Sequence, residues 1–466
     1  MLSLNNIIED LETSQEISFE KSFDYAQQCS SLLKSNEEDG RKLVINALNN
    51  WDKIEEQSKK VWADLIESSG FYPYLNNGDG ISLHNLPAEI RKGLHLSKNL
   101  DSKYFHDDQF ELLNLLKSDK NVIVSAPTSF GKSLLFEEII ASNKYQNLII
   151  IQPTLALLDE TRKKLIKYKD NYKLIVRTSQ EPSEDRGNVF LFTAERVNEY
   201  HLFPPIDFLV IDEFYKLSGN RDDERSSSLN NAFHYILKTF SPKFYLLGPN
   251  IDNISEGFSE AYNAIFFKSN YSLVDSRQID IYKNHEGEFG QRGKKAENKE
   301  SVLFNLLIDL VDEQTIIYCS SPKRVRNLSK KFTNYLQSIQ TEETKHEYPL
   351  SEWIEKYVNS EWSLLNNLKY DIGIHDGALQ KHITTSIIDY FNNGKLKYLF
   401  CTSTIIEGVN TSAKNIIYFD SKKGPNDVDY FDYSNIKGRA GRMMVHFVGN
   451  IFYHMHQIVG ERIVII

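Results

Sequence analysis

The sequence predicts the α/β fold class: two tandem domains, each a parallel sheet with helices on both faces, preceded by an α-helical N-terminal region. From Tyr104 onward, short β-branched and aromatic runs alternate with helical stretches, a pattern typical of parallel strands joined by crossover helices. A polar stretch at about 275–300 interrupts this alternation, which then restarts. The 466 residues offer room for about three domains.

Residues 1–100 are expected to be helical. Apolar side chains recur there at three- and four-residue steps, with a break near Ser58 and stop signals at Gly70 and Pro73. These apolar positions are Val44, Leu48, Trp51, Ile54, Val61 and Leu65. We expect a packed accessory helical region, and the alternative is a helix that binds a protein partner.

The first α/β domain is expected over 101–274, and a linker over 275–300. Its strands are expected near 122–125, 148–151, 189–192, 208–211 and 244–247. The second α/β domain is expected over 301–466, with a helical insertion at 349–369. Its strands are expected near 315–319, 398–402, 415–419 and 451–453.

Charge and composition exclude several classes of protein and of site. The formal net charge is −10, and residues 1–100 carry 16 acidic and 10 basic side chains, so a nucleic-acid site has to be a local groove rather than a basic face. No run of about 18 apolar residues and no signal peptide is evident, which predicts a cytoplasmic protein without a membrane span. Three widely spaced cysteines argue against a zinc site or a disulfide framework.

A phosphate-binding loop follows the first expected strand and precedes an apolar helix. Its sequence is Ala126-Pro127-Thr128-Ser129-Phe130-Gly131-Lys132-Ser133, with Ala at the first position instead of Gly. Backbone N–H groups and the helix N-terminus are suited to phosphate oxygens. In such a loop Lys132 reaches the β- and γ-phosphates, and the Ser133 hydroxyl ligates Mg²⁺.

An acidic pair, Asp212-Glu213, ends the expected strand 208–211. The carboxyl ends of parallel strands line the crevice where ligands bind in open α/β sheets. Asp212 is therefore the second candidate ligand for Mg²⁺, and Glu213 is suited to activating an attacking water.

These residues resemble the motifs of superfamily 2 DExD/H-box helicases, whose core consists of two tandem RecA-like domains. In the first domain, Gln109 stands 23 residues before Lys132, where the family has a glutamine that reads adenine. Tyr104 or Phe105 would then stack on the base. Pro153-Thr154 resembles the first nucleic-acid-contacting block, and Thr193-Ala194-Glu195-Arg196 resembles the second.

The second domain carries blocks that resemble the superkiller-type branch of this superfamily. They are His375-Asp376-Gly377, the block from Thr402 to Asn410, and Asn435-Ile436-Lys437-Gly438-Arg439-Ala440-Gly441-Arg442. The resemblance implies that Arg439 and Arg442 stabilise charge on the transferring phosphoryl group. It assigns Gly408 and Asn410 to ATP binding. The nucleic-acid contacts it implies are Pro153, Thr154, Thr193, Glu195, His375, Gly377 and Thr402.

The resemblance implies an ATP- and Mg²⁺-dependent motor on DNA or RNA, holding a single-stranded track without sequence preference. Phosphoryl transfer needs a phosphate cradle, a metal, an oriented water and a cation, and the last would come from the second domain. One alternative is an ATP-gated clamp that serves a partner, such as a nuclease in a defence system, without unwinding. Another is a non-enzymatic interaction protein with a degenerate core.

Four features depart from the family pattern. Gly248-Pro249-Asn250 stands where Ser-Ala-Thr is usual, Asn435 replaces Gln, and Asp376 replaces a small or basic residue. The chain stops about 24 residues after Arg442, which favours either a two-domain core or a truncated chain. The apolar end 463–466 suggests a strand.

Overall fold

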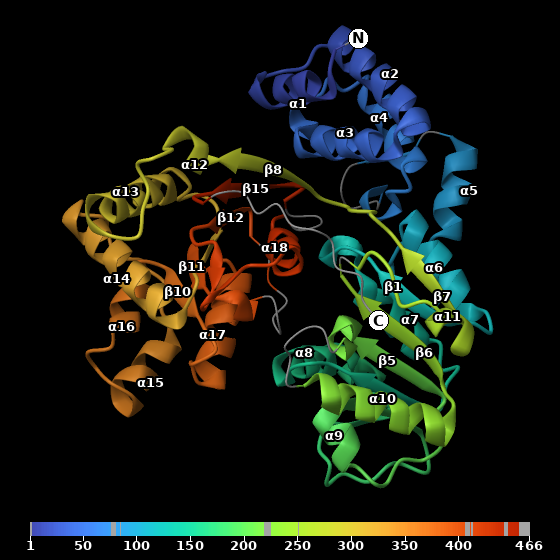
Figure 1. The fold of residues 1–466 in the computed structure, drawn as a ribbon. Helices are drawn as coiled ribbons and strands as arrows, with labels where there is room; N and C mark the ends of the chain where they lie inside the picture. Colours follow the sequence, from blue (N-terminus) through green and yellow to red (C-terminus); the bar gives the residue numbers. More distant parts are fainter. Residues whose placement is uncertain are drawn as a thin grey trace. The chain divides into compact units, whose positions relative to one another are not determined.

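The computed structural model describes residues 2–75, 81–83, 85–218, 225–249, 251–405, 411, 413–441 and 446–455. The described chain forms two compact units: unit 1 runs through Asp275, and unit 2 begins at Ser276. Figure 1 shows the ribbon of both units. The predicted fold class is confirmed, because each unit contains a parallel sheet flanked by helices and unit 1 begins with a helical region.

The N-terminal region is helical, as predicted. Its helices are α1 (Leu4–Thr13), α2 (Phe19–Ser35), α3 (Glu37–Asn49), α4 (Lys59–Ser68) and α5 (Leu86–Leu94). Ser3, Ser18 and Asn36 cap the first three helices by accepting a backbone N–H. The break expected near Ser58 is present, since a turn over residues 55–58 separates the short 3₁₀ turn Trp51–Lys53 from α4. Leu43, Val44 and Trp62 are fully buried between these helices.

The unit 1 sheet has seven strands within the described residues, in the order β3-β4-β2-β5-β6-β1-β7, and all neighbouring pairs are parallel. The strands are β1 (Asn121–Ser125), β2 (Asn147–Ile151), β3 (Tyr172–Ile175), β4 (Gly187–Phe192), β5 (Phe208–Asp212), β6 (Lys243–Gly248) and β7 (Ala264–Lys268). The helices are α6 (Asp107–Lys117), α7 (Lys132–Ala141), α8 (Leu155–Leu165), α9 (Ala194–Glu199), α10 (Ser226–Phe240) and α11 (Phe258–Ala261). The five strands predicted from apolar runs are all present.

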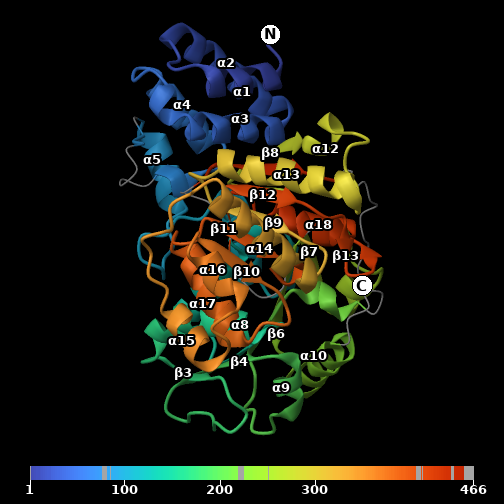
Figure 2. The ribbon, with the colours of Figure 1, turned by 90° about the vertical axis from the view of Figure 1, so that its left-hand side faces the viewer.

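The unit 2 sheet has the order β10-β11-β9-β12-β15-β8. Its strands are β8 (Asp275–Asp280), β9 (Thr315–Tyr318), β10 (Ile372–His375), β11 (Tyr398–Cys401), β12 (Asn415–Tyr418) and β15 (Val448–Tyr453), and a separate hairpin pairs β13 (Lys422–Lys423) with β14 (Asn426–Asp427). The helices are α12 (Ile281–Asn284), α13 (Gly293–Asp309), α14 (Pro322–Ser338), α15 (Pro349–Tyr357), α16 (Ser363–Leu368), α17 (Lys381–Asn392) and α18 (Tyr430–Lys437). The expected helical insertion is present as α15 and α16. Helices α14, α16 and α17 pack on β10 (Figure 2).

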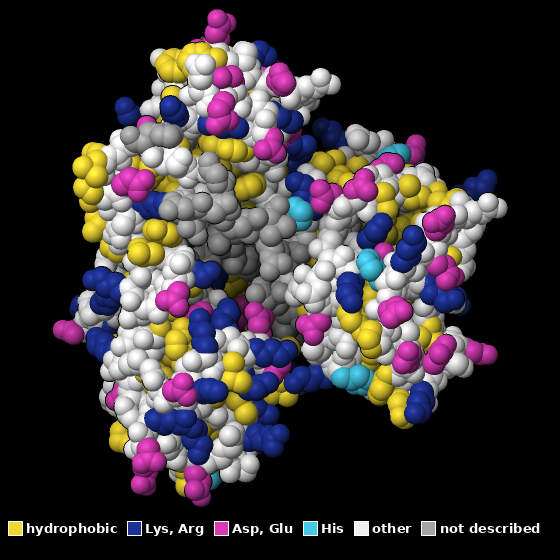
Figure 3. Space-filling model, turned by 180° about the vertical axis from the view of Figure 1, so that it is seen from behind, with side chains coloured by type: hydrophobic (Ala, Val, Ile, Leu, Met, Phe, Trp, Pro, Cys, Tyr) yellow, Lys and Arg dark blue, Asp and Glu magenta, His cyan; other side chains and the backbone are white. Residues whose placement is uncertain are grey.

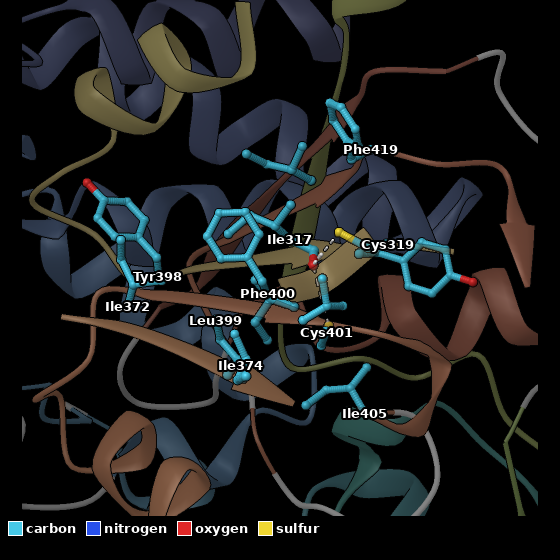
Figure 4. Close-up of a cluster of buried hydrophobic side chains, with 14 of the residues drawn as sticks. Ile317, Cys319, Ile372, Ile374, Tyr398, Leu399, Phe400, Cys401, Ile405 and Phe419 are labelled. Atoms are coloured by element: carbon cyan, nitrogen blue, oxygen red, sulfur yellow. Dashed lines mark hydrogen bonds between the residues drawn. The ribbon is translucent and has the colours of Figure 1, made fainter. Parts of the chain in front are cut away.

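The unit 2 core lies between these helices and the sheet. Side chains of β9, β10 and β11 meet Ile405 and Phe419 there (Figure 4). Cys319 and Cys401 are part of this core, and both thiols point to the carbonyl of Ile317, at 4.0 and 3.6 Å. All three cysteines are buried free thiols, and burial raises the pKa of Cys401.

The segment 275–300, expected to be a linker, is folded. It carries β8, α12 and the first turns of α13, and β8 is an edge strand of the unit 2 sheet. Edge strands expose one side to solvent, so a strand of this kind can be as polar as Asp275–Asp280 and gives no apolar run in the sequence.

Candidate active site

The carboxyl ends of five neighbouring strands meet at one edge of the unit 1 sheet. The register places Ser125 beside Gly248, Asp212 beside Leu247, and Ile151 beside both Phe192 and Ile211. The segments that follow these strands therefore begin side by side, and they contain the phosphate loop, the acidic pair and both predicted nucleic-acid blocks of this domain.

The predicted phosphate loop connects β1 to α7. Thr128–Phe130 form a 3₁₀ turn, and Gly131 then adopts a left-handed conformation with φ of +77° before α7 begins. The backbone angle at Gly131 requires glycine, and a Cβ atom there would also lie 2.7 Å from Nε2 of Gln109 and displace that side chain. Ala126 is buried and donates its N–H to the carbonyl of Gly248.

Lys132 is the first residue of α7, and its side chain reaches back to the start of the loop. Its Nζ donates to the carbonyl oxygens of Ala126 and Pro127, at 2.7 and 2.8 Å. Ser133 follows at the second residue of α7, and it is partly buried. Thr128 is exposed, and the Ser129 hydroxyl is 3.0 Å from that of Ser272. The ammonium is thus held at the carboxyl end of β1 by carbonyl groups of the loop itself.

Asp212 ends β5, as predicted, and its two carboxylate oxygens have different partners. Oδ1 accepts the N–H of Glu213 at 3.1 Å, and Oδ2 accepts Nε2 of Gln152 at 3.1 Å. Burial raises the pKa of Asp212, while the Gln152 hydrogen bond and the positive charge of Lys132 act in the opposite direction. Mg²⁺ prefers oxygen ligands, and both the partly buried Asp212 carboxylate and the partly buried Ser133 hydroxyl offer them.

Glu213 has a strained backbone. Its φ of 61° and ψ of 41° are left-handed, a conformation that costs a non-glycine residue roughly 1–2 kcal/mol. It precedes the short turn Phe214–Leu217, whose residues are buried. Strain of this kind is concentrated at functional sites.

Gln109 is hydrogen-bonded to the backbone of the phosphate loop. The side chain is buried, donates Nε2 to the carbonyl of Phe130 at 2.8 Å, and accepts the His106 N–H at 3.2 Å. Phe105 is 1% exposed, so in this structure its ring has no free face for a base. The Tyr104 ring is partly exposed and lies 5.4 Å from the Lys92 ammonium.

The two blocks of unit 1 that were predicted to contact nucleic acid adjoin the acidic pair. Thr154 caps α8 by accepting the N–H of Leu157 at 3.3 Å, Thr193 precedes α9 and is buried, and Glu195 is exposed. A cavity of about 20 Å³, large enough for one water molecule, separates the blocks from Asp212. It is lined by Ile151, Gln152, Pro153, Thr193, Ala194, Glu195, Asp212, Lys216, Arg225 and Leu229.

Gln152 is a site residue that the sequence did not identify. It links Asp212 to α8, because its Oε1 accepts the Thr161 hydroxyl at 2.8 Å while its Nε2 donates to Asp212. One signal in the sequence could have identified Gln152. It is a polar residue directly after the apolar strand 148–151, at the sheet edge where Asp212 was also expected.

Two of the residues predicted in unit 2, His375 and Thr402, lie close together at the carboxyl ends of β10 and β11. The His375 Nδ1 lies 3.1 Å from the Thr404 hydroxyl, which lies 3.0 Å from that of Thr402. His375 is 3% exposed, and burial lowers its pKa to about 4, so the imidazole is neutral at physiological pH. A Cβ at Gly377 would lie 3.2 Å from the Thr404 methyl group. Thr404 thus joins the His375 and Thr402 blocks.

The Arg439 side chain donates Nη1 to the carbonyl of Thr411 at 3.3 Å. Gly408, Asn410 and Arg442 lie outside the described residues, as do Asn250 and the expected strand at 463–466.

Asp376, which departs from the family pattern, has a structural role. Its fully buried carboxylate accepts Nε and Nη2 of Arg326 at 3.2 and 3.1 Å, and it also accepts the N–H of Ala378. The two-pronged ion pair and the turn bond hold the segment after β10 in place. An acidic residue is therefore stable at this position.

Gly248, the first residue of the other divergent block, is closely packed. A Cβ there would lie 2.6 Å from Cδ1 of Ile251 and 3.1 Å from the Phe214 ring. The serine usual in the family does not fit at this position without displacement of these side chains.

A phosphate loop, an acidic pair and a second parallel sheet with clustered polar blocks define a class of protein, and comparison with known proteins gives the same class. Residues 106–243 match the family described as DEAD/DEAH box helicase, and residues 298–444 match the helicase conserved C-terminal domain. The chain therefore contains a superfamily 2 DEAD/DEAH-box helicase core. Residues 1–86 match the anti-bacteriophage protein B N-terminal domain.

Individual relatives agree with this classification. The chain is 36% identical over 443 residues to anti-bacteriophage protein B of Escherichia coli, which covers 92% of this chain and 58% of that protein. It is 23% identical to the ATP-dependent DNA helicase Hel308 of Caldivirga maquilingensis, over 77% of this chain and 50% of that protein. The Hel308 of Thermoplasma volcanium is 25% identical over 72% of this chain. The chain thus spans about half the length of these relatives.

The described residues contain no helix that is both long and apolar enough to cross a membrane. In the same part of the chain, no three His, Cys, Asp or Glu side chains are grouped as a metal site.

Proposed function

We propose that this protein is an ATP-dependent nucleic-acid motor of the superkiller-type branch, using ATP and Mg²⁺ to move on or unwind DNA or RNA. The arrangement of Lys132, Asp212 and the strained Glu213 at one sheet edge carries this proposal. The helicase families matched by both units support it.

In this proposal the loop binds the phosphates of ATP. Lys132 exchanges its two carbonyl partners for oxygens of the β- and γ-phosphates, and the N–H groups at the start of α7 donate to the same groups. Ser133 and Asp212 would hold Mg²⁺, which when bound neutralises charge on the phosphates. Glu213 orients the attacking water and accepts its proton.

The charge that develops on the transferring group needs a cation, and we assign this role to Arg439 and Arg442. Both are in the block that resembles the arginine-finger motif. Gly408 and Asn410 are assigned to ATP binding on the same resemblance, and Gln109 to adenine. A site completed by residues of the second domain would couple hydrolysis to domain motion.

Nucleic acid is proposed to contact the blocks beside each sheet edge through its phosphates. The contacts are assigned to Pro153, Thr154, Thr193, Glu195, His375, Gly377 and Thr402. Hydroxyl and backbone N–H groups read no base, so binding without sequence preference follows. Figure 3 shows Lys and Arg together with Asp and Glu on the face drawn, so this face is not uniformly basic.

An ATP-gated clamp that grips nucleic acid without unwinding is the second candidate, and Gly248 favours it. Ile251 and Phe214 fill the space that the serine side chain of the coupling block would need. A strand-displacement assay run beside an ATPase assay decides between the two. ATP-dependent release of the displaced strand supports a motor, whereas nucleic-acid-stimulated hydrolysis without displacement supports a clamp.

The relative named anti-bacteriophage protein B suggests the biological setting. We propose that this chain acts in the cytoplasm against bacteriophage, with a protein partner bound through its N-terminal helical region. Plaque counts on cells that express the wild type or Lys132→Ala test this role. Protection that depends on Lys132 supports it, and equal plaque counts with and without the protein contradict it.

A further inference from the structure

A chain of buried aromatic side chains connects the N-terminal helical region with the phosphate loop. It runs through Tyr271, in the segment after β7, to His106, which precedes α6. His106 is 0% exposed and Tyr271 is 2% exposed. Neither residue belongs to a helicase motif identified in the sequence.

Both ring nitrogens of His106 have partners. Nδ1 accepts the N–H of Gln109 at 3.3 Å, which caps α6, and Nε2 is 3.1 Å from the carbonyl oxygen of Phe130. Burial lowers the pKa of His106 to about 3, so the ring is neutral and carries a single N–H. Only the tautomer with hydrogen on Nε2 satisfies both contacts, since a carbonyl oxygen cannot donate.

The bond to Phe130 acts on the phosphate loop itself. Phe130 O accepts both His106 and Gln109, and the Phe130 ring lies edge-on to His106 at 4.7 Å. Gly131 and Lys132 follow immediately in the chain. A displacement of His106 would therefore move the backbone that carries Lys132.

Tyr271 packs on His106 and links it to the N-terminal region. The two rings are stacked, with centroids 4.3 Å apart and planes inclined by 7°. The Tyr271 hydroxyl donates to the carbonyl of Ser69 at 2.6 Å, the Arg41 guanidinium lies 4.7 Å from the ring centre, and Phe71 meets the ring edge-on. Ser69, Arg41 and Phe71 all belong to the N-terminal region.

The residues next to Tyr271 also contact both the phosphate loop and the N-terminal helical region. Ser272 lies against Ser129 of the phosphate loop at 3.0 Å, while Leu273 accepts the Tyr74 hydroxyl and Asp275 accepts the Asn46 amide. The short segment 269–275 thus touches the loop and the helical region at once.

We propose that His106 is a positioning residue for the phosphate loop, and that Tyr271 makes ATP affinity depend on how the N-terminal region is seated. The inference rests on the proposed ATP-binding function and adds a role for residues 1–75. A partner that loosens the contacts of Arg41 or Ser69 with Tyr271 would weaken ATP binding without touching the nucleotide.

Three variants of the full chain test the connection. His106→Asn keeps a side-chain acceptor for the cap of α6 but loses the stacked ring and the reach to Phe130. Tyr271→Phe keeps the ring and loses only the bond to Ser69. Arg41→Gln removes the cation from the ring. Tyr200→Phe is the matched control, because Tyr200 is also buried and donates to a backbone carbonyl, that of Gln180, at 2.8 Å.

The first measurement is the Kd for ATP with Mg²⁺, from competition with a fluorescent ATP analogue. We expect His106→Asn to raise Kd about tenfold and Tyr271→Phe and Arg41→Gln about threefold, in line with the loss of single buried interactions. Tyr200→Phe should leave Kd unchanged. In the His106→Asn background, Arg41→Gln should add little, because its effect passes through His106.

The second measurement is hydrogen exchange of residues 128–133 without nucleotide. Faster exchange in Tyr271→Phe than in Tyr200→Phe supports the inference, even if the wild type binds no ATP and the proposed function fails. Equal exchange in these two variants overturns the inference. An ATP affinity that is unchanged in folded His106→Asn also overturns it. So does an ATP affinity that Tyr271→Phe and Tyr200→Phe lower equally. If His106→Asn fails to fold, the tyrosine pair still decides.

Discussion

The Gln152 amide donates to Oδ2 of Asp212 across 3.1 Å, while its carbonyl oxygen accepts the Thr161 hydroxyl at 2.8 Å. The carboxylate proposed to hold Mg²⁺ is thus hydrogen-bonded to the residue that directly precedes Pro153-Thr154, the block proposed to contact nucleic acid. In the proposed function, this hydrogen bond would transmit a change at Pro153-Thr154 to the proposed site of ATP hydrolysis.

We predict that Gln152→Leu, which removes the amide at similar size, lowers nucleic-acid-stimulated ATP turnover about tenfold, the effect of one buried charge-assisted hydrogen bond. The Mg²⁺ concentration for half-maximal rate should rise as well. Thr161→Val removes only the outer bond and should have a smaller effect in the same direction. A folded Gln152→Leu variant with normal rate and normal Mg²⁺ dependence would show that the contact is only structural.

Glu213→Gln should bind ATP but not hydrolyse it, because the amide keeps the shape of the side chain and cannot accept a proton from water. Nucleotide binding and single-turnover hydrolysis, measured on the same sample, check this. Normal hydrolysis would assign Glu213 a structural role, and loss of ATP binding would point to a part in holding Mg²⁺.

Asp212→Asn is expected to change the stability of the nucleotide-free protein in a pH-dependent way. Burial raises the pKa of Asp212 above its usual value of 3.8, so the folded state favours the protonated form and loses that stabilisation as pH rises through the raised pKa. The asparagine carries no charge to desolvate, but its amide nitrogen cannot accept the N–H that one carboxylate oxygen accepts. The Tm of the variant relative to the wild type should therefore rise as the pH increases above 3.8, whatever its sign at low pH. A Tm difference that is the same at every pH would contradict this.

Most of the fold was predictable because the central strands are buried on both faces. β1, β2, β5 and β6 consist of apolar runs that stand out in the sequence. β3 and β8 lie at sheet edges, are only partly buried, and gave no such run. β7 is also a partly buried edge strand, and its short apolar run 264–267 was not identified as a strand from the sequence. β10 is buried but short, and Gly373 interrupts its apolar residues.

The parts of the candidate site that are formed by consecutive residues could be predicted from the sequence. The phosphate loop and Asp212-Glu213 are contiguous and follow strands. Gln152, Thr404 and His106 were missed because their partners come from segments that only the sheet brings together: Gln152 meets Asp212 from 60 positions away, and His106 meets Phe130 from 24.

We predict that Arg442→Ala lowers ATP turnover by about 10³–10⁵-fold, the range for an arginine finger. Arg442 lies outside the described residues. ATP affinity should fall much less, because Lys132 and the loop hold the ground-state phosphates. Arg442→Lys should not restore the rate, since a point ammonium lacks the planar two-pronged donor. Near-normal turnover in Arg442→Ala would remove this residue from the mechanism.

In the proposed function, hydrolysis of ATP at Lys132, Asp212 and Glu213 depends on nucleic acid. The most direct test is the steady-state ATPase rate of the full chain with single-stranded DNA, single-stranded RNA, duplexes and no nucleic acid, with Lys132→Ala measured alongside. We predict a rate that rises with at least one single-stranded nucleic acid and is lost in folded Lys132→Ala. A rate that no nucleic acid changes, or one that survives in Lys132→Ala, would contradict the claim.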